Sequence, residues 1–150
     1  DSKQLSAVRR EELAAIIREQ SDYGIGMVSA QVIDQINILR ATRLAMWRAV
    51  AALGEPPDAL IVDGREVVAG SIVQRAEVKA DERCFSVAAA SIVAKVARDQ
   101  LMCELDERFP GYGLAIHKGY GTAVHLEALE RLGSSTIHRL SFAPVRAALR

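Results

Sequence analysis

Apolar side chains recur along the chain at two spacings, one typical of helices and one typical of short buried strands. Helical spacing predicts helices over residues 6–20, 30–53, 87–108 and 122–132. Short apolar or alternating runs predict strands over residues 23–30, 59–62 and 76–80. Ser6 is a suitable cap for the first helix, and Gly54 followed by two prolines ends the second. Helices that alternate with short apolar strands indicate an α/β protein.

The composition is that of a globular domain. Half of the 150 residues are apolar and a quarter are charged, with 19 basic and 19 acidic side chains. These values exclude a disordered tail, a collagen-like repeat and a disulfide-stapled mini-protein. Because the sequence has no internal repeats or linker-like tracts, we expect a single domain over residues 1–150. No apolar run reaches the roughly 18 residues of a membrane helix, and no targeting segment is visible, so we expect a cytoplasmic protein.

Cysteine and charge usage add little to this picture. Cys84 and Cys103 lack the spacing of a redox or metal motif, and we expect both to be small buried residues in a reducing compartment. The last 40 residues carry five basic and two acidic side chains. Such an end could bind a polyanion, although a short window can show the same difference by chance. His117, His125 and His138 show no paired ligand spacing, so zinc ligation is not expected.

Two aspartates follow predicted strands. Asp63 comes directly after the run 59–62, and Asp81 after the run 76–80. Ligands bind at the carboxyl ends of strands in α/β sheets, and carboxylates there suit Mg²⁺ or Mn²⁺. Two such groups could support metal-assisted phosphodiester hydrolysis. The simpler alternative, which spacing alone favours, is that Asp63 opens an Asp-Gly turn and Asp81 caps the next helix.

The segment 117–122, His-Lys-Gly-Tyr-Gly-Thr, combines two potential cations with glycines, an aromatic ring and a hydroxyl. This mixture suits a phosphate backbone and a stacked nucleotide, with Tyr120 as the stacking ring. It is not a Walker loop, because the GxxxxGK[ST] spacing is absent. An ordinary surface loop with a half-buried tyrosine explains the composition equally well.

Taken in order over the whole chain, several segments resemble the bacterial ribonuclease HII family. The matching segments are DSKQLS (1–6), IDQINI (33–38), VDG (62–64), VKAD (78–81), AAASIVAKVARD (88–99), FPGYG (109–113), HKGYGT (117–122) and IHRLSFAPV (137–145). No single segment is decisive, but the ordered set is highly specific.

The resemblance implies a ribonuclease H-like fold, in which helices flank a mixed sheet and a helical region follows at the C-terminus. It implies an endonuclease that cleaves the RNA strand of RNA–DNA hybrids and cuts 5′ of single ribonucleotides in duplex DNA, as in ribonucleotide excision repair. The cofactor would be Mg²⁺ or Mn²⁺ in a two-metal site, and the protein a monomer without membrane contact.

The resemblance also assigns roles to individual residues. Asp63 and Asp81 match active-site carboxylates that bind the metal ions. Ser2 and Lys3 match the segment that grips backbone phosphate near the ribonucleotide. Tyr120 matches a tyrosine that packs against the sugar of the nucleotide following the ribose.

Two further aspartates lie in matching segments, and we expect structural roles for both. Asp99 is assigned to helix packing or to support of the site. Asp34 is assigned to local hydrogen bonds near a helix start.

The family pattern also contains an N-terminal strand with Asp-Glu-Ala-Gly-Arg-Gly and a second strand, and neither has a match here. We therefore expect an N-terminally incomplete domain that lacks two of the four carboxylates and the Gly-Arg-Gly motif that reads the 2′-hydroxyl. The strand at 23–30 would then be separated from its sheet, and the chain alone should fold poorly. The alternatives are a catalytically inactive nucleic-acid-binding fragment and, without the resemblance, an unrelated α/β phosphate-handling enzyme.

Overall fold

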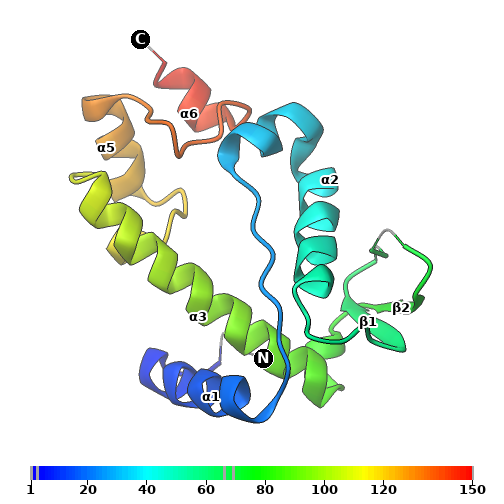
Figure 1. The fold of residues 1–150 in the computed structure, drawn as a ribbon. Helices are drawn as coiled ribbons and strands as arrows, with labels where there is room; N and C mark the ends of the chain where they lie inside the picture. Colours follow the sequence, from blue (N-terminus) through cyan, green and yellow to red (C-terminus); the bar gives the residue numbers. More distant parts are fainter. Residues whose placement is uncertain (1, 3, 66, 69, 150) are drawn as a thin grey trace. The chain divides into compact units, whose positions relative to one another are not determined.

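The computed structural model describes residues 2, 4–65, 67–68 and 70–149. Its elements, most of them labelled in Figure 1, are α1 (Ala7–Gln20), α2 (Ala30–Ala51), β1 (Ala59–Asp63), β2 (Val73–Glu77), the 3-10 helix η1 (Ala80–Glu82), α3 (Phe85–Arg108), α4 (Leu114–His117), α5 (Ala123–Leu132) and α6 (Ala143–Ala147). Contacts divide the chain into two compact units, Asp1–Val28 with Leu39–Val96 and Ser29–Ile38 with Ala97–Arg150. The single domain over residues 1–150 stays a prediction.

In the first unit, α1 begins where the sequence predicts. The side chain of Ser6 accepts a hydrogen bond from the backbone N–H of Arg9 at 3.2 Å, which satisfies one of the free donors at the helix start. The helix ends at Gln20, and the backbone N–H of Ser21 closes it on the carbonyl of Ile17. The predicted helix 6–20 is thus confirmed.

The predicted strand at 23–30 is wrong. Residues 22–29 form an extended segment outside the strands of the described chain, and α2 begins at Ala30. A Cβ atom added to Gly24 would lie 1.9 Å from the carbonyl oxygen of Ala49, and one added to Gly26 would lie 1.8 Å from that of Ala45. The glycines therefore permit close packing of this segment on α2, which the alternating pattern does not distinguish from sheet pairing.

The second predicted helix is interrupted. Asn37 has φ 66° and ψ 165°, a non-helical conformation that kinks α2, and the helix ends at Ala51, two residues before the predicted end at Leu53. Asparagine tolerates positive φ better than most residues. The kink lies beside the boundary between the two units, so the two halves of α2 belong to different units.

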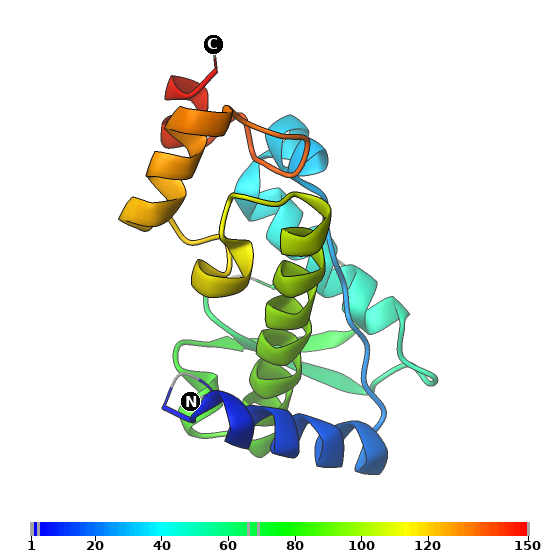
Figure 2. The same cartoon turned by 90° about the vertical axis from the view of Figure 1, so that its left-hand side faces the viewer.

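Strands β1 and β2 pair in parallel, with Ala59 opposite Val73 and Asp63 opposite Glu77 (Figure 2, green). They form a two-stranded sheet within the described residues, and the α/β class is confirmed. The predicted strand at 76–80 is displaced, because β2 ends at Glu77 and Lys79 adopts a left-handed conformation with φ 60°. The chain therefore turns into η1 three residues after β2.

Helix α3 begins two residues before the predicted start at 87 and ends at Arg108 as predicted. In the second unit, Thr122 caps α5 by accepting from the backbone N–H of His125 at 3.4 Å, which confirms the predicted helix at 122–132. The buried apolar residues that form the core of this unit are Tyr112, Leu114, Ala128, Leu129, Val145 and Ala148. The glycine-rich segment between α3 and α5 contains the short helix α4, which the sequence analysis did not predict.

The two cysteines differ from expectation. Cys103 is exposed and Cys84 is half-buried, so the prediction that both are buried is wrong. Cys103 accepts a hydrogen bond from Nζ of Lys118 at 3.0 Å, which is a surface contact between α3 and the segment after α4. Within the described part of the chain, every helix is too short or too polar to span a membrane.

Candidate active site

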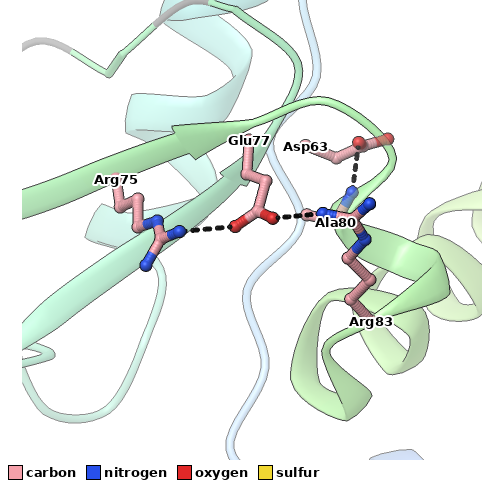
Figure 3. A network of polar contacts seen from close by, with 5 residues as sticks. All are labelled: Asp63, Arg75, Glu77, Ala80 and Arg83. Carbon is pink, nitrogen blue, oxygen red and sulfur yellow. Dashed lines mark hydrogen bonds and ion pairs between the residues drawn. The ribbon is translucent and has the colours of Figure 1, made fainter.

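Asp63 occupies the carboxyl end of β1, in the first unit. Its Oδ1 accepts a hydrogen bond at 3.0 Å from the backbone N–H of Ala80, which itself is only 1 % exposed (Figure 3). An ionised carboxylate has several acceptor positions, so this bond orients the group and leaves capacity for a further ligand. The residue as a whole is exposed. A ligand in solvent can therefore reach a carboxylate that the backbone already holds in place.

Asp81 directly follows Ala80, in η1, and is half-buried. The bond from Ala80 to Asp63 therefore joins the end of β1 to the residue before Asp81. The parallel register explains this meeting, because it aligns Asp63 with Glu77, and the left-handed Lys79 then turns the chain back. The chain bends at Gly64, which has φ 131° and whose N–H donates to the carbonyl of Glu77 at 3.0 Å, and such a bend fits either interpretation of Asp63.

Glu77, which the sequence analysis did not single out, contributes a third carboxylate near this strand end. Its two oxygens pair with Arg75 at 3.3 Å and with Arg83 at 3.0 Å (Figure 3). Two arginines balance its charge, and this contact pattern differs from the backbone contact of Asp63. The feature that could have identified Glu77 is its place opposite Asp63 in the pairing of the two strands.

A third ion pair joins Lys79, the residue before η1, to Glu82 at the end of η1. Nζ of Lys79 lies 2.9 Å from Oε1 of Glu82. This hydrogen bond and the opposite charge raise the pKa of Lys79 and lower the pKa of Glu82. Both groups therefore stay charged around neutral pH, one on each side of Asp81.

Ser2 is buried in the first unit and contacts α3. Its hydroxyl oxygen accepts a hydrogen bond from the hydroxyl of Ser91 at 2.9 Å, 89 residues away, and Arg10 donates to its backbone carbonyl at 3.1 Å. The Ser2 hydroxyl keeps its own proton for donation to an acceptor such as phosphate. Lys3, the other residue predicted to grip phosphate, lies outside the described residues.

Tyr120 belongs to the second unit and lies between α4 and α5, with 58 % of its surface exposed. Its backbone is held at both ends, because its N–H donates to the carbonyl of His117 and its carbonyl accepts from the ring of His125, each at 2.9 Å. The side chain predicted to contact a nucleotide is thus carried by a fixed backbone.

Asp34 is structural, but its contacts are not local. It accepts hydrogen bonds from the backbone N–H groups of Leu140 at 2.8 Å and Ser141 at 2.9 Å, and from the Ser141 hydroxyl. The hydrogen bonds from Ser141 lower the pKa of Asp34. Its partners lie more than 100 residues away, so the predicted local role is wrong. Asp99, half-buried in α3, keeps its predicted packing role as a prediction.

The sequence model of the ribonuclease HII family matches residues 1–145. The chain belongs to the ribonuclease HII family. Ribonuclease HII from Laribacter hongkongensis is 52 % identical over 152 residues, covering 99 % of this chain and 77 % of that protein. Ribonuclease HII from Nitrosococcus oceani is 52 % identical over 147 residues, covering 97 % of this chain and 73 % of that protein.

The fold agrees with this family. The crystal structure of ribonuclease H2 from Pyrococcus horikoshii OT3 matches with a TM-score of 0.80 and 26 % sequence identity, covering 99 % of this chain and 78 % of that chain. The predicted ribonuclease H-like fold is therefore confirmed. Members of the ribonuclease HII family are hydrolases that cut RNA internally, and they depend on divalent metal ions.

The donor set at the end of β1 fits such an ion. In the ranges that the structure describes, no group of three or more histidine, cysteine, aspartate or glutamate side chains is gathered as a metal site. Mg²⁺, however, commonly takes only one or two protein carboxylates and completes its coordination with water and substrate phosphate. Asp63, oriented by Ala80, and Asp81 carry hard oxygen atoms of that kind, and they are the residues that would hold such an ion.

Proposed function

We propose that this protein cleaves the RNA strand of RNA–DNA hybrids and cuts 5′ of single ribonucleotides in duplex DNA, with Asp63 and Asp81 as ligands of Mg²⁺ or Mn²⁺. The observation that supports this proposal is the hydrogen bond from Ala80 to Asp63, because Ala80 directly precedes Asp81 in the chain. Membership of the ribonuclease HII family supports the substrate class.

The proposed reaction is hydrolysis of one phosphodiester bond. Water adds to phosphorus, the bond to the 3′ oxygen of the preceding nucleotide breaks, and the products are a 3′-hydroxyl and a 5′-phosphate on the ribonucleotide. When bound, divalent ions supply activation of water and stabilisation of the leaving oxygen. Asp63 contributes a carboxylate whose orientation is set before the substrate arrives, so little reorganisation is needed during the reaction.

The remaining predicted residues position the substrate. Lys3 would neutralise backbone phosphate, and the hydroxyl of Ser2 would donate a hydrogen bond to it. Tyr120 presents an exposed ring, which suits packing against a sugar or a base. Discrimination of RNA from DNA depends on the 2′-hydroxyl, and Tyr120 is the residue of this chain proposed to lie against the nucleotide that follows it.

The alternative functions have less support. An inactive nucleic-acid-binding fragment would retain Lys3 and Tyr120, but the comparisons match enzymes over nearly the whole chain. An unrelated phosphate-handling enzyme is set aside because the chain belongs to the ribonuclease HII family. The cytoplasmic location and the monomeric state stay predictions.

The test is a cleavage assay on a DNA duplex that contains one ribonucleotide, with Mn²⁺ or Mg²⁺ and with an all-DNA duplex as the control. The 150-residue chain is compared with a version extended at its N-terminus by the strands of the family pattern. We expect a cut 5′ of the ribonucleotide by the extended version alone. Cleavage by the 150-residue chain would show that other residues complete the site, and cleavage by neither would refute the proposed function.

A further inference from the structure

Three histidines that lie far apart in the sequence pack together in the second unit. His117, His125 and His138, here called the histidine cluster, are between 6 % and 8 % exposed. The rings of His117 and His125 stack at 4.3 Å with 15° between their planes, and the Nε2 atoms of His125 and His138 are 3.2 Å apart. The established family and the proposed function assign no task to this cluster.

Backbone carbonyls fix the proton on two of the rings, because a carbonyl oxygen can only accept. Nε2 of His117 lies 2.7 Å from the carbonyl oxygen of Tyr112, so Nε2 carries the proton. Nδ1 of His117 then accepts from the backbone N–H of Gly119 at 3.2 Å. Nδ1 of His125 lies 2.9 Å from the carbonyl oxygen of Tyr120, so in His125 it is Nδ1 that carries the proton.

The position of the proton on His125 fixes the position of the proton on His138. A neutral His125 protonated at Nδ1 has a lone pair at Nε2, so Nε2 of His138 must donate to it across 3.2 Å. Nδ1 of His138 is then an acceptor, and it lies 3.1 Å from the backbone nitrogen and 2.9 Å from the hydroxyl oxygen of Ser135. One continuous chain of hydrogen bonds therefore runs from Ser135 through two neutral imidazoles to the carbonyl of Tyr120.

A second proton on either ring would break this chain. Protonation of His125 at Nε2 would set two N–H groups against each other, and protonation of His138 at Nδ1 would oppose the N–H of Ser135. Burial lowers the pKa of both histidines, and the charge of a neighbouring histidine, His117 for His125 and His125 for His138, also lowers it. The hydrogen bonds to the backbone of Tyr120 and of Ser135 raise the pKa of His125 and of His138, respectively, and only partly offset this lowering. The neutral arrangement is thus the form that the packed unit favours around neutral pH.

Other titratable and charged groups surround the pair. His117 stacks on His125, and the ring of Tyr112 lies 4.8 Å from that of His138. The cationic side chains next to the histidines in sequence, Lys118 and Arg139, contact other groups. Lys118 lies 3.0 Å from Sγ of Cys103, and the guanidinium of Arg139 lies over the ring of Phe142 at 5.4 Å.

We propose that His125 and His138 are positioning residues for Tyr120. In their neutral forms they support the Tyr120 carbonyl, which also accepts from the backbone N–H of Thr122 at 2.9 Å, and thereby fix the backbone that presents its exposed ring to the nucleic acid. Protonation leaves the bond from Nδ1 of His125 to this carbonyl in place, but it sets two Nε2–H groups against each other and so breaks the link to His138 that holds the His125 ring. The inference rests on the proposed role of Tyr120 in the reaction. It predicts that the contribution of Tyr120 to cleavage rises with pH through the histidine range.

The first experiment measures the hydrogen-bonded chain without reference to activity. Side-chain ¹⁵N spectra of the full protein between pH 5 and 8 should show neutral rings at pH 7.5, with the proton at Nδ1 in His125 and at Nε2 in His138. Both should titrate below the ordinary value of about 6.5. A charged ring at pH 7.5, or the opposite tautomer in either residue, would overturn the inference whatever the protein cleaves.

The second experiment is a double-mutant cycle in the N-terminally extended version, measured as cleavage of the duplex with one ribonucleotide. His138→Leu removes the donor, and His138→Gln restores an amide N–H that does not titrate. At pH 7.5, Tyr120→Ala should lower the rate roughly 5- to 150-fold, the range expected for loss of one aromatic stack. His138→Leu should lower the cleavage rate by no more than Tyr120→Ala does. His138→Gln should restore most of the rate that His138→Leu loses, and it should shift the acid limb of the pH–rate profile.

Comparing His138→Leu in the parent and in the Tyr120→Ala protein distinguishes positioning of Tyr120 from a general loss of stability. In the Tyr120→Ala protein, His138→Leu should cause no further loss, whereas an equal loss in both backgrounds would refute positioning through Tyr120. If the spectra are as expected but Tyr120→Ala cleaves normally, the proposed role of Tyr120 is wrong and the positioning claim is overturned with it. If cleavage is absent in all variants while the spectra are as expected, the proposed function alone is refuted.

Discussion

Replacement of Asp63 separates its chemical role from its structural one, because its carboxylate has both. One oxygen accepts the backbone N–H of Ala80, and the group as a whole is a proposed metal ligand. Asp63→Asn keeps an Oδ1 acceptor and removes the charge. Asp63→Ala removes both. The pair of variants therefore tests the two roles independently.

The structure sets the expected magnitudes. Ala80 is 1 % exposed, so its N–H without Asp63 would have little access to water. A buried donor left unsatisfied costs about 1–3 kcal/mol, which is the expected loss in the free energy of unfolding for Asp63→Ala. Asp63→Asn should change stability by less than about 0.5 kcal/mol. Cleavage should fall at least ~100-fold in both, because even outer-shell partners of a metal contribute 10- to 100-fold.

Two measurements decide the outcome. Urea denaturation reports stability, and cleavage and binding of the single-ribonucleotide duplex report function, with the protein in its active form as the reference. Duplex binding should be largely retained in Asp63→Asn, because the change removes a metal ligand and no phosphate contact. Normal cleavage by Asp63→Asn would refute its role as a ligand, and equal stability of Asp63→Ala and the parent would refute the structural role of the bond to Ala80.

Three further predictions concern the packing of the chain. Gly26→Ala should lower the free energy of unfolding by about 1–3 kcal/mol, because its Cβ would lie 1.8 Å from the carbonyl oxygen of Ala45 in α2. In the control Gly54→Ala the nearest atom lies at 3.4 Å, so the free energy of unfolding should hardly change. Urea denaturation measures both, and equal effects of the two substitutions would contradict the close approach of Gly26 to α2. Asp34→Ala should speed hydrogen exchange at the backbone N–H groups of residues 140 and 141 more than Asp34→Asn, which keeps an acceptor oxygen. Unchanged exchange in both variants would refute the protection of these N–H groups by Asp34. Burial lowers the pKa of His125 and His138, so the unfolded chain binds more protons than the folded one below pH ~6.5. The stability they contribute should be fully present above that pH and lost as the pH falls through their folded-state pKa values, by up to ~1.4 kcal/mol per pH unit for each; denaturation curves that show stability rising toward acid pH would refute this.

Local sequence signals located most of the elements. Ser6 and Thr122 mark helix starts through side-chain acceptors that act within three residues, and apolar spacing located α1, α3 and α5. The run before Asp63 located β1. These signals succeed because capping and helical amphipathicity depend on residues close together in the chain.

Where the sequence analysis failed, the deciding partner was distant. The alternating segment with Gly24 and Gly26 has a strand-like pattern, but its neighbour is the backbone of α2, more than 15 residues later. Lys79 and Asn37 adopt positive φ angles that redirect the chain, and the local sequence does not predict either of these conformations. Asp34 was assigned a local role, although its hydrogen-bond donors lie beyond residue 139.

By itself, the sequence determined the family and the predicted carboxylates, because an ordered set of short motifs is specific even when each part is weak. Only the tertiary structure decided how Ala80 orients Asp63 and that Ser2 contacts Ser91. It alone also brought the histidine cluster together. The physical reason is that a hydrogen bond or ring contact depends on distances of about 3–5 Å in space, and residues 8 to 89 positions apart reach those distances only after the chain has folded.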